Sequence, residues 1–265
     1  MESIREIYKI GIGPSSSHTM GPKRAAERFL ARTGGATSYR VTLYGSLAAT
    51  GKGHLTDKAI LDVLTPVAPT EIVWKPDVFL PFHPNAMKFE AFDSMGKVID
   101  EWTVYSIGGG DIAEEGQSRV HNHVYEMTRI ADIQAWCEKT GHNYWEYVEQ
   151  CEGPEIWDYL RKVWHVMKAA VERGIEAEGV LPGGLGVRRK AVTYYVHAQG
   201  YTGSLKSRGL TYAYALAVSE ENAAGGLIVT APTCGSCGVL PAVIFHLADV
   251  NDYRPIRILR ALATA

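Results

Sequence analysis

Six apolar residues between positions 154 and 174 recur at the spacing of one helical face. They are Ile156, Tyr159, Leu160, Val163, Met167 and Val171, and the segment opens at Pro154 and closes at Gly174. Proline fits the first turn of a helix, and glycine commonly follows the last turn. The pattern therefore predicts one long amphipathic helix, and it makes a helical second half of the chain the expectation.

The two halves of the chain differ in pattern. The second half has further apolar helical stretches at 210–224 and 239–250. The first half predicts helices at 22–32 and 57–64, and short strands at 39–45, 71–74, 87–92 and 98–106, separated by turns rich in glycine and proline. We predict an α+β N-terminal domain, residues 1–152, followed by a mainly α-helical domain, residues 153–265. The helix-forming run at 257–265 has no cap, which we interpret as a truncation.

The composition favours a small-molecule ligand. The 265 residues are 46% hydrophobic and 21% charged with a net charge of −2, so the chain has no excess of basic residues for nucleic acid or an anionic membrane. The most apolar stretch, 238–250, contains Pro241 and His246 and is shorter than the roughly 20 residues that span a bilayer. The charged N-terminus lacks the apolar core of a signal peptide, so we expect a cytoplasmic protein.

A segment rich in hydroxyl groups precedes the first predicted helix. Residues 11–22 read GIGPSSSHTMGP and place Ser15, Ser16, Ser17, His18 and Thr19 between two Gly-Pro pairs. Backbone N–H groups, hydroxyls and the positive end of the helix dipole can together bind a carboxylate or phosphate. A solvated, capped turn is the simpler interpretation, but a histidine inside such a serine run favours a binding loop.

A second segment, 44–57, reads YGSLAATGKGHLTD. It suggests a nucleotide-binding P-loop, but five residues separate Gly45 from Gly51 where that motif needs four, and Gly53 follows Lys52 where it needs Ser or Thr. We therefore reject the P-loop. The segment is interpreted as a strand that leads into a flexible loop presenting His54 beside Lys52, where an imidazole can exchange a proton near neutral pH.

The four cysteines fall into two groups. Cys137 and Cys151 have no partner at ligand spacing and are interpreted as packing residues. Cys234 and Cys237 form a Cys-x-x-Cys at the predicted start of a helix. A thioredoxin-like dithiol usually has tryptophan where Thr233 stands, a zinc site needs a second ligand pair, and an iron–sulfur cluster needs further thiolates. Spacing alone leaves these three interpretations open.

These segments, in this order, resemble the bacterial iron–sulfur-dependent L-serine dehydratases, or L-serine ammonia-lyases. The family carries GIGPSSSHT, then YGSLxxTGKGHxTD, then YSIGGG, which stands here at 105–110. Its helical domain carries counterparts of EGVLPG at 178–183, SEENAAGG at 219–226 and TAPTCGSCGVLPA at 230–242. The resemblance runs from end to end, and it implies a β domain followed by a helical catalytic domain.

The resemblance also implies site residues. His54 matches the histidine of GKGHxTD and is expected to be the catalytic base, with Lys52 as a second catalytic candidate. The expected substrate-binding residues are Ser15, Ser16, Ser17, His18, Thr19 and Asn222. Cys237 matches the family's cluster-ligating cysteine, whereas Cys234 replaces an asparagine and is a second metal candidate.

The implied reaction converts L-serine to pyruvate and ammonia with a [4Fe-4S] cluster and without pyridoxal phosphate. The family's other cluster cysteines come from segments beyond Ala265, so we expect the 265-residue chain by itself to be inactive. A non-catalytic module that binds a small amino acid is the alternative, and threonine is a rival substrate. We expect a homodimer that binds neither nucleic acid nor membrane.

Overall fold

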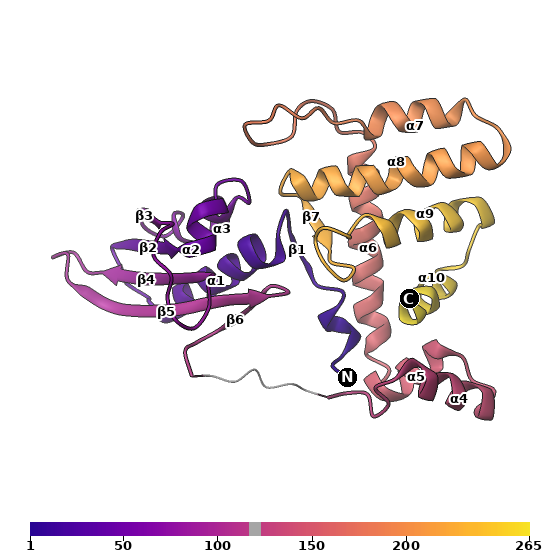
Figure 1. Ribbon diagram of the computed structural model, residues 1–265, viewed down its shortest axis with the longest axis horizontal. Helices are drawn as coiled ribbons and strands as arrows, with labels where there is room; N and C mark the ends of the chain where they lie inside the picture. Colours follow the sequence, from indigo (N-terminus) through magenta and orange to yellow (C-terminus); the bar gives the residue numbers. More distant parts are fainter. Residues whose placement is uncertain (117–122) are drawn as a thin grey trace. The chain divides into compact units, whose positions relative to one another are not determined.

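The computed structural model describes residues 1–116 and 123–265. The chain forms two compact units (Figure 1). One, here called the sheet unit, comprises residues 12–119, and the other, the helical unit, comprises residues 1–11 and 120–265. A sheet-containing region followed by a helix-rich region confirms the predicted fold class, and each unit is described separately below.

The sheet unit holds, among its described residues, a five-stranded sheet in the order β3-β2-β4-β5-β6. Strand β2, the second in this order, pairs in parallel with β3 and antiparallel with β4, and the remaining pairs are antiparallel. The strands are β2 (Ser38–Tyr44), β3 (Thr70–Lys75), β4 (Ala86–Phe92), β5 (Val98–Gly108) and β6 (Asp111–Ala113). Four of them match the predicted strands, and β6 escaped prediction because it is only three residues long.

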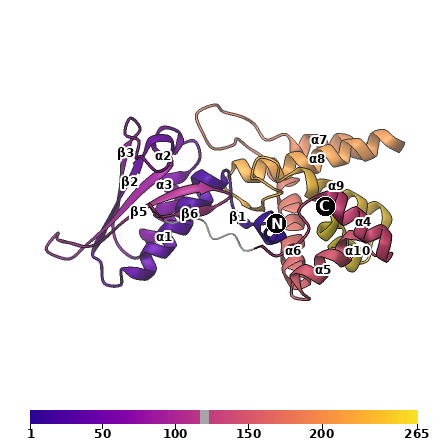
Figure 2. The same cartoon turned by 60° about the horizontal axis from the view of Figure 1, so that its bottom comes forward.

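Two helices supply the core of the sheet unit. Helix α1 (Gly21–Arg32) packs against α3 (Thr56–Leu64), as Figure 2 shows. Phe29 of α1 and Ile60 of α3 join Val41 of β2 in one fully buried cluster. Alternate strand residues point the other way, where Arg40 pairs with the exposed Glu71. The sheet thus has one apolar and one charged face, as expected when helices cover only one of its sides.

The segment that connects the parallel strands β2 and β3 differs from the prediction. Residues 45–50 were predicted to begin a loop, but they form a short helix, α2 (Gly45–Thr50). Gly45 has φ +47°, and an added Cβ there would lie 2.7 Å from the carbonyl oxygen of Pro84. Only glycine turns the chain from β2 directly into α2 without strain and without this clash.

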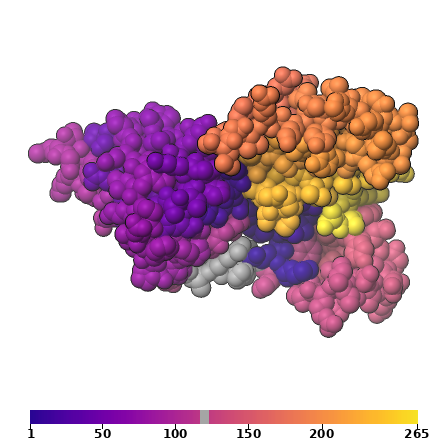
Figure 3. Space-filling model, turned by 45° about the horizontal axis from the view of Figure 1, so that its top comes forward, coloured from indigo at the N-terminus to yellow at the C-terminus, as the bar shows by residue number. Residues whose placement is uncertain are grey.

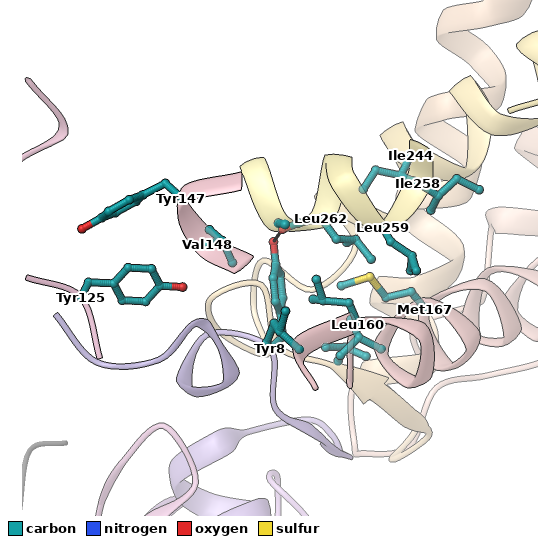
Figure 4. Packing of buried hydrophobic residues seen from close by; sticks show 14 of the residues in the cluster. Tyr8, Tyr125, Tyr147, Val148, Leu160, Met167, Ile244, Ile258, Leu259 and Leu262 are labelled. Atoms are coloured by element: carbon teal, nitrogen blue, oxygen red, sulfur yellow. Dashed lines mark hydrogen bonds between the residues drawn. The ribbon is translucent and has the colours of Figure 1, made fainter. Parts of the chain in front are cut away.

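The helical unit packs around α6 (Ile156–Gly174), which the apolar stripe predicted. Its core, shown in Figure 4, includes Leu160 and Met167. The other helices are α4 (Ile130–Thr140), α5 (Tyr144–Glu152), α7 (Ala191–Gln199), α8 (Gly203–Ala223), α9 (Val239–Asn251) and α10 (Pro255–Thr264), beside the short strand β7 (Leu227–Val229). Helix α8 begins seven residues before its predicted start at 210, and α7 was not predicted.

The predicted domain boundary at residue 152 is not where the structure divides. Helices α4 and α5, which the sequence analysis assigned to the first domain, belong to the helical unit. Ile133 of α4 and Tyr147 and Val148 of α5 are buried in its core (Figure 4). The two helices have 11 and 9 residues against 19 in α6, so their apolar residues repeat over fewer turns and give a weaker periodic signal.

The first eleven residues also belong to the helical unit. Tyr8 is buried among the core residues, and its hydroxyl donates to the carbonyl of Leu262 in α10 at 2.9 Å (Figure 4). The strand β1 (Ile10–Ile12) pairs with β7, and Thr230 donates its backbone N–H to the carbonyl of Lys9 at 2.9 Å. The N-terminal segment is thus held in this unit by hydrogen bonds between residues more than 200 positions apart in the sequence.

Helices α7 and α8 pack side by side and form a continuous surface of the helical unit, orange in Figure 3. They are joined by a short turn at Gly200–Thr202. None of the described helices, including the 21-residue α8, is long and apolar enough to cross a membrane.

We predict that Leu160→Ala lowers the free energy of unfolding of the helical unit by about 2–5 kcal/mol, because it leaves a cavity in the core. Leu185→Ala is the matched control, since Leu185 is 91% exposed and its loss should change the free energy by about 0.5 kcal/mol or less. Urea unfolding followed by circular dichroism measures both. Equal effects of the two substitutions would contradict the packing described above.

Candidate active site

The serine-rich segment forms a tight turn that leads into α1. Residues Ser16–Met20 make a π-helical turn, and the hydroxyl of Ser15 caps it by accepting the N–H of His18 at 3.1 Å. An added Cβ at Gly21 would lie 2.3 Å from the Oγ of Ser106 in β5. The glycine therefore lets the turn lie directly against Ser106, which belongs to the YSIGGG segment.

The imidazole of His18 lies between two serine hydroxyls. Its Nδ1 is 2.9 Å from the Oγ of Ser17, and its Nε2 is 3.1 Å from the Oγ of Ser46. Burial lowers the pKa of His18, the nearby His54 lowers it further, and a hydrogen bond with Ser46 opposes these effects. A histidine with a pKa below its usual value is neutral at neutral pH.

His54 lies in the loop between α2 and α3, and its ring faces that of His18. The two ring centroids are 4.8 Å apart, and the planes are inclined by 40°. The Nδ1 of His54 is 3.0 Å from the carbonyl oxygen of Thr50. Because a carbonyl can only accept, Nδ1 carries the proton, and the Nε2 of the neutral ring keeps its lone pair. Within the part of the chain that the structure describes, that nitrogen makes no hydrogen bond.

The other predicted residues of the sheet unit lie in different settings. Ser15 and Ser17 are near each other, with their Oγ atoms 3.4 Å apart, and Ser16 is partly buried in the same turn. Thr19 is only 1% exposed, and its hydroxyl donates to the carbonyl of His54 at 2.7 Å. Lys52 is exposed, with its Nζ 5.6 Å from the centre of the Trp74 ring.

Sequence reasoning did not single out Ser46, although it contacts His18. It stands in the YGSL segment, 28 positions after the histidine, and only the fold brings the two together. A serine at the start of a short helix carries no signal of such a contact, because its hydroxyl could equally cap the helix or face solvent.

The predicted Asn222 lies in the helical unit, in the last turn of α8, and is 9% exposed. Its neighbour Glu221 pairs with Arg173 and Arg189, each at 3.0 Å. Glu220 accepts the backbone N–H of Lys190 at 2.6 Å at the beginning of α7. The acidic part of the SEENAAGG segment thus ties α8 to α6 and to the chain that enters α7.

Cys234 and Cys237 also lie in the helical unit, in the turn before α9. They are 3% and 1% exposed, and the N–H of Cys237 donates to the carbonyl of Cys234 at 3.3 Å. Burial raises the pKa of Cys234 to about 11, and burial together with Cys234 raises that of Cys237 to about 12. Reactive dithiols need a lowered thiol pKa, so the thioredoxin-like interpretation is disfavoured.

These cysteines do not by themselves fit a complete iron–sulfur site. Within residues 1–116 and 123–265, no group of three or more His, Cys, Asp or Glu side chains could hold a metal ion. Cys137 and Cys151 are instead packed against the core of the helical unit. The described residues thus offer two adjacent thiols, whereas a [4Fe-4S] cluster is normally held by about four.

Both halves of the chain match models of one protein family. The model of the serine dehydratase beta chain matches residues 3–72, and that of the serine dehydratase alpha chain matches residues 84–265. The chain belongs to the serine dehydratase family. The resemblance to the serine dehydratases that the motifs indicated is therefore confirmed.

Several curated relatives are named L-serine dehydratase. The L-serine dehydratase of Streptomyces coelicolor is 35% identical over 92% of this chain, and L-serine dehydratase 2 of Escherichia coli is 37% identical over 93%. That of Haemophilus influenzae is 34% identical over the whole chain. The matches cover 65%, 66% and 70% of these relatives, so the chain spans about two thirds of their length.

We predict that His18 titrates below the ordinary pKa of about 6.5 and that His54→Asn raises its pKa. The substitution removes the electrostatic effect by which His54 lowers the pKa of His18, while the burial of His18 persists and keeps that pKa below the usual value. NMR titration of ¹⁵N-labelled histidines measures this. A His18 midpoint that is unchanged in the variant would show that the two rings do not interact.

Proposed function

We propose that this chain carries the proton-transfer and substrate-binding part of an L-serine dehydratase, which converts L-serine to pyruvate and ammonia. The observation that carries the proposal is the facing pair of His18 and His54, bordered by serine hydroxyls, in a member of the serine dehydratase family. The names of the relatives supply the substrate. No observation favours the alternative of a binding module without catalysis.

The serine-rich turn is proposed to bind the substrate's charged groups. Ser15 and Ser17 present hydroxyls on one side of the His18 ring, and Ser46 lies on the other. Hydroxyl groups donate to a carboxylate, and a neutral imidazole can donate from one nitrogen while it accepts at the other. Ser16, Lys52 and Asn222 stay second-rank candidates for substrate binding or catalysis.

His54 is proposed to be the general base. Its Nε2 takes the proton from Cα of serine, the electron pair of that bond forms the Cα–Cβ double bond, and the hydroxyl group leaves Cβ. The departing hydroxide takes up a proton to become water, which balances the proton that His54 removed from Cα. The resulting aminoacrylate tautomerises to an imine, which takes up water to give pyruvate and ammonia. A neutral imidazole whose other nitrogen is fixed by Thr50 is suited to the first step.

The expected [4Fe-4S] cluster stays a prediction that rests on the resemblance. Because the described residues provide only two adjacent thiols, we assign no step of the reaction to a cluster. Cys237 is proposed as a ligand, with Cys234 as the second candidate. The expected homodimer and the cytoplasmic location also stay predictions, the first testable by analytical ultracentrifugation.

We predict that His54→Gln lowers kcat for pyruvate formation from L-serine by about 10²–10⁴-fold, because it removes the base and keeps a side chain of similar size. The matched control is His197→Gln, since His197 is exposed on α7. A coupled lactate dehydrogenase assay after anaerobic reconstitution measures turnover. Unchanged turnover in His54→Gln would overturn the assignment of the base.

Iron and sulfide analysis of the anaerobically reconstituted chain tests the cluster. If Cys237 is a ligand, Cys237→Ser lowers bound iron and sulfide and weakens the visible absorption. Cys151→Ser is the control, because Cys151 packs against the core and has no predicted metal role. Equal iron content in the two variants would contradict the assignment of Cys237.

A further inference from the structure

Two buried threonines connect the loops that carry the histidines. Thr19 donates to the carbonyl oxygen of His54 at 2.7 Å, and Thr56 donates to that of His18 at 2.6 Å. Both side chains are 1% exposed or less. The contacts are reciprocal, because each threonine lies within two positions of one histidine and bonds to the backbone of the other.

We propose that Thr19 and Thr56 are positioning residues that hold the imidazoles of His18 and His54 in their facing arrangement. The proposal rests on the proposed function only for its effect on turnover, because the geometry of the two rings can be measured without substrate. It also gives Thr19 a role different from the substrate contact that its motif suggested.

The hydroxyl of Thr19 makes two hydrogen bonds, one in each loop. It accepts the backbone N–H of Ser15 at 3.2 Å while it donates to the carbonyl of His54. Thr19 therefore links the cap of the serine-rich turn to the second loop. Because a hydroxyl has a single proton, Thr19 cannot donate to a substrate without breaking its bond to the carbonyl of His54.

Thr56 stands at the first position of α3, yet its hydroxyl does not cap that helix. The preceding residue, Leu55, occupies the N-cap position with φ +57° and makes no side-chain cap. The left-handed region costs a leucine free energy, so other contacts must hold the loop in this conformation. The bond from Thr56 to the carbonyl of His18 is one such contact, and His54 lies beside the strained residue.

A third buried threonine provides a control for packing alone. Thr33 directly follows α1 and is 3% exposed, and its hydroxyl donates to the carbonyl of Phe29 in α1 at 2.9 Å. Thr33→Val therefore removes a buried hydroxyl of the same kind without touching either histidine loop.

The test compares Thr19→Val and Thr56→Val with Thr19→Ser, Thr56→Ser and Thr33→Val in the full chain. NMR of labelled histidines reports the nuclear Overhauser effect between the two rings and the titration midpoint of His18. His54 is the titratable group that acts on this midpoint from the opposite loop, and Ser46 contributes a hydrogen bond. We expect the valine variants to lose the ring contact and shift the midpoint toward the ordinary value, while the serine and Thr33 variants match the unmodified chain.

Turnover of L-serine provides the second readout, with kcat lowered about tenfold to a hundredfold in the valine variants and restored by serine. Unchanged ring signals in the valine variants would overturn the proposal. Serine variants that lose the ring contact would also overturn it, because the methyl groups of the threonines, rather than their hydroxyls, would then hold the two rings. If a valine variant does not fold, the serine variants still provide this test. Altered ring signals together with unchanged turnover in the valine variants would leave the positioning role standing and contradict the proposed role of His54 as the base.

Discussion

Parallel pairing of β2 with β3 is the constraint on which the candidate site depends. Two parallel strands cannot be joined by a tight hairpin, so the chain between them must cross over the sheet. Here the crossover contains α2, the loop with His54, and α3. Because α3 packs against α1, the same crossover brings this loop to the turn with His18. The meeting of the two histidines is thus a consequence of sheet topology.

The two imidazoles are chemically different although they face each other. His18 has a hydroxyl partner at each nitrogen and a lowered pKa, which keeps it neutral and fixed. His54 has one nitrogen bound to the backbone and the other without a partner among the described residues. Enzymes commonly place two titratable groups in different environments, so that the groups differ in pKa and can take different roles in the reaction.

The helical unit is organised around α6, and segments far apart in the sequence complete its core. Tyr8 reaches Leu262, and the β1–β7 pair joins residues near positions 10 and 229. Buried cysteines lie just before α9, where the packing that excludes water also raises their pKa values. Loss of a proton from such thiols would require a strongly favourable partner, such as a bound metal.

The sequence by itself determined the elements with strong periodicity and the motifs. The stripe on α6, the strands β2 and β4 and the family resemblance could all be read from residue order, because burial imposes a regular spacing on apolar residues. His18 and His54 were also singled out as candidate site residues from their motifs. The weakly periodic α4 and α7, and the helix α2 that begins at Gly45, were missed.

Only the tertiary structure decided how those residues act together. The contact of Ser46 with His18, the crossed bonds of Thr19 and Thr56, and the place of residues 1–11 in the helical unit join positions that are distant in the sequence. Local spacing carries no record of such contacts, because a hydroxyl or a short apolar segment finds its partner only when the chain has folded around it.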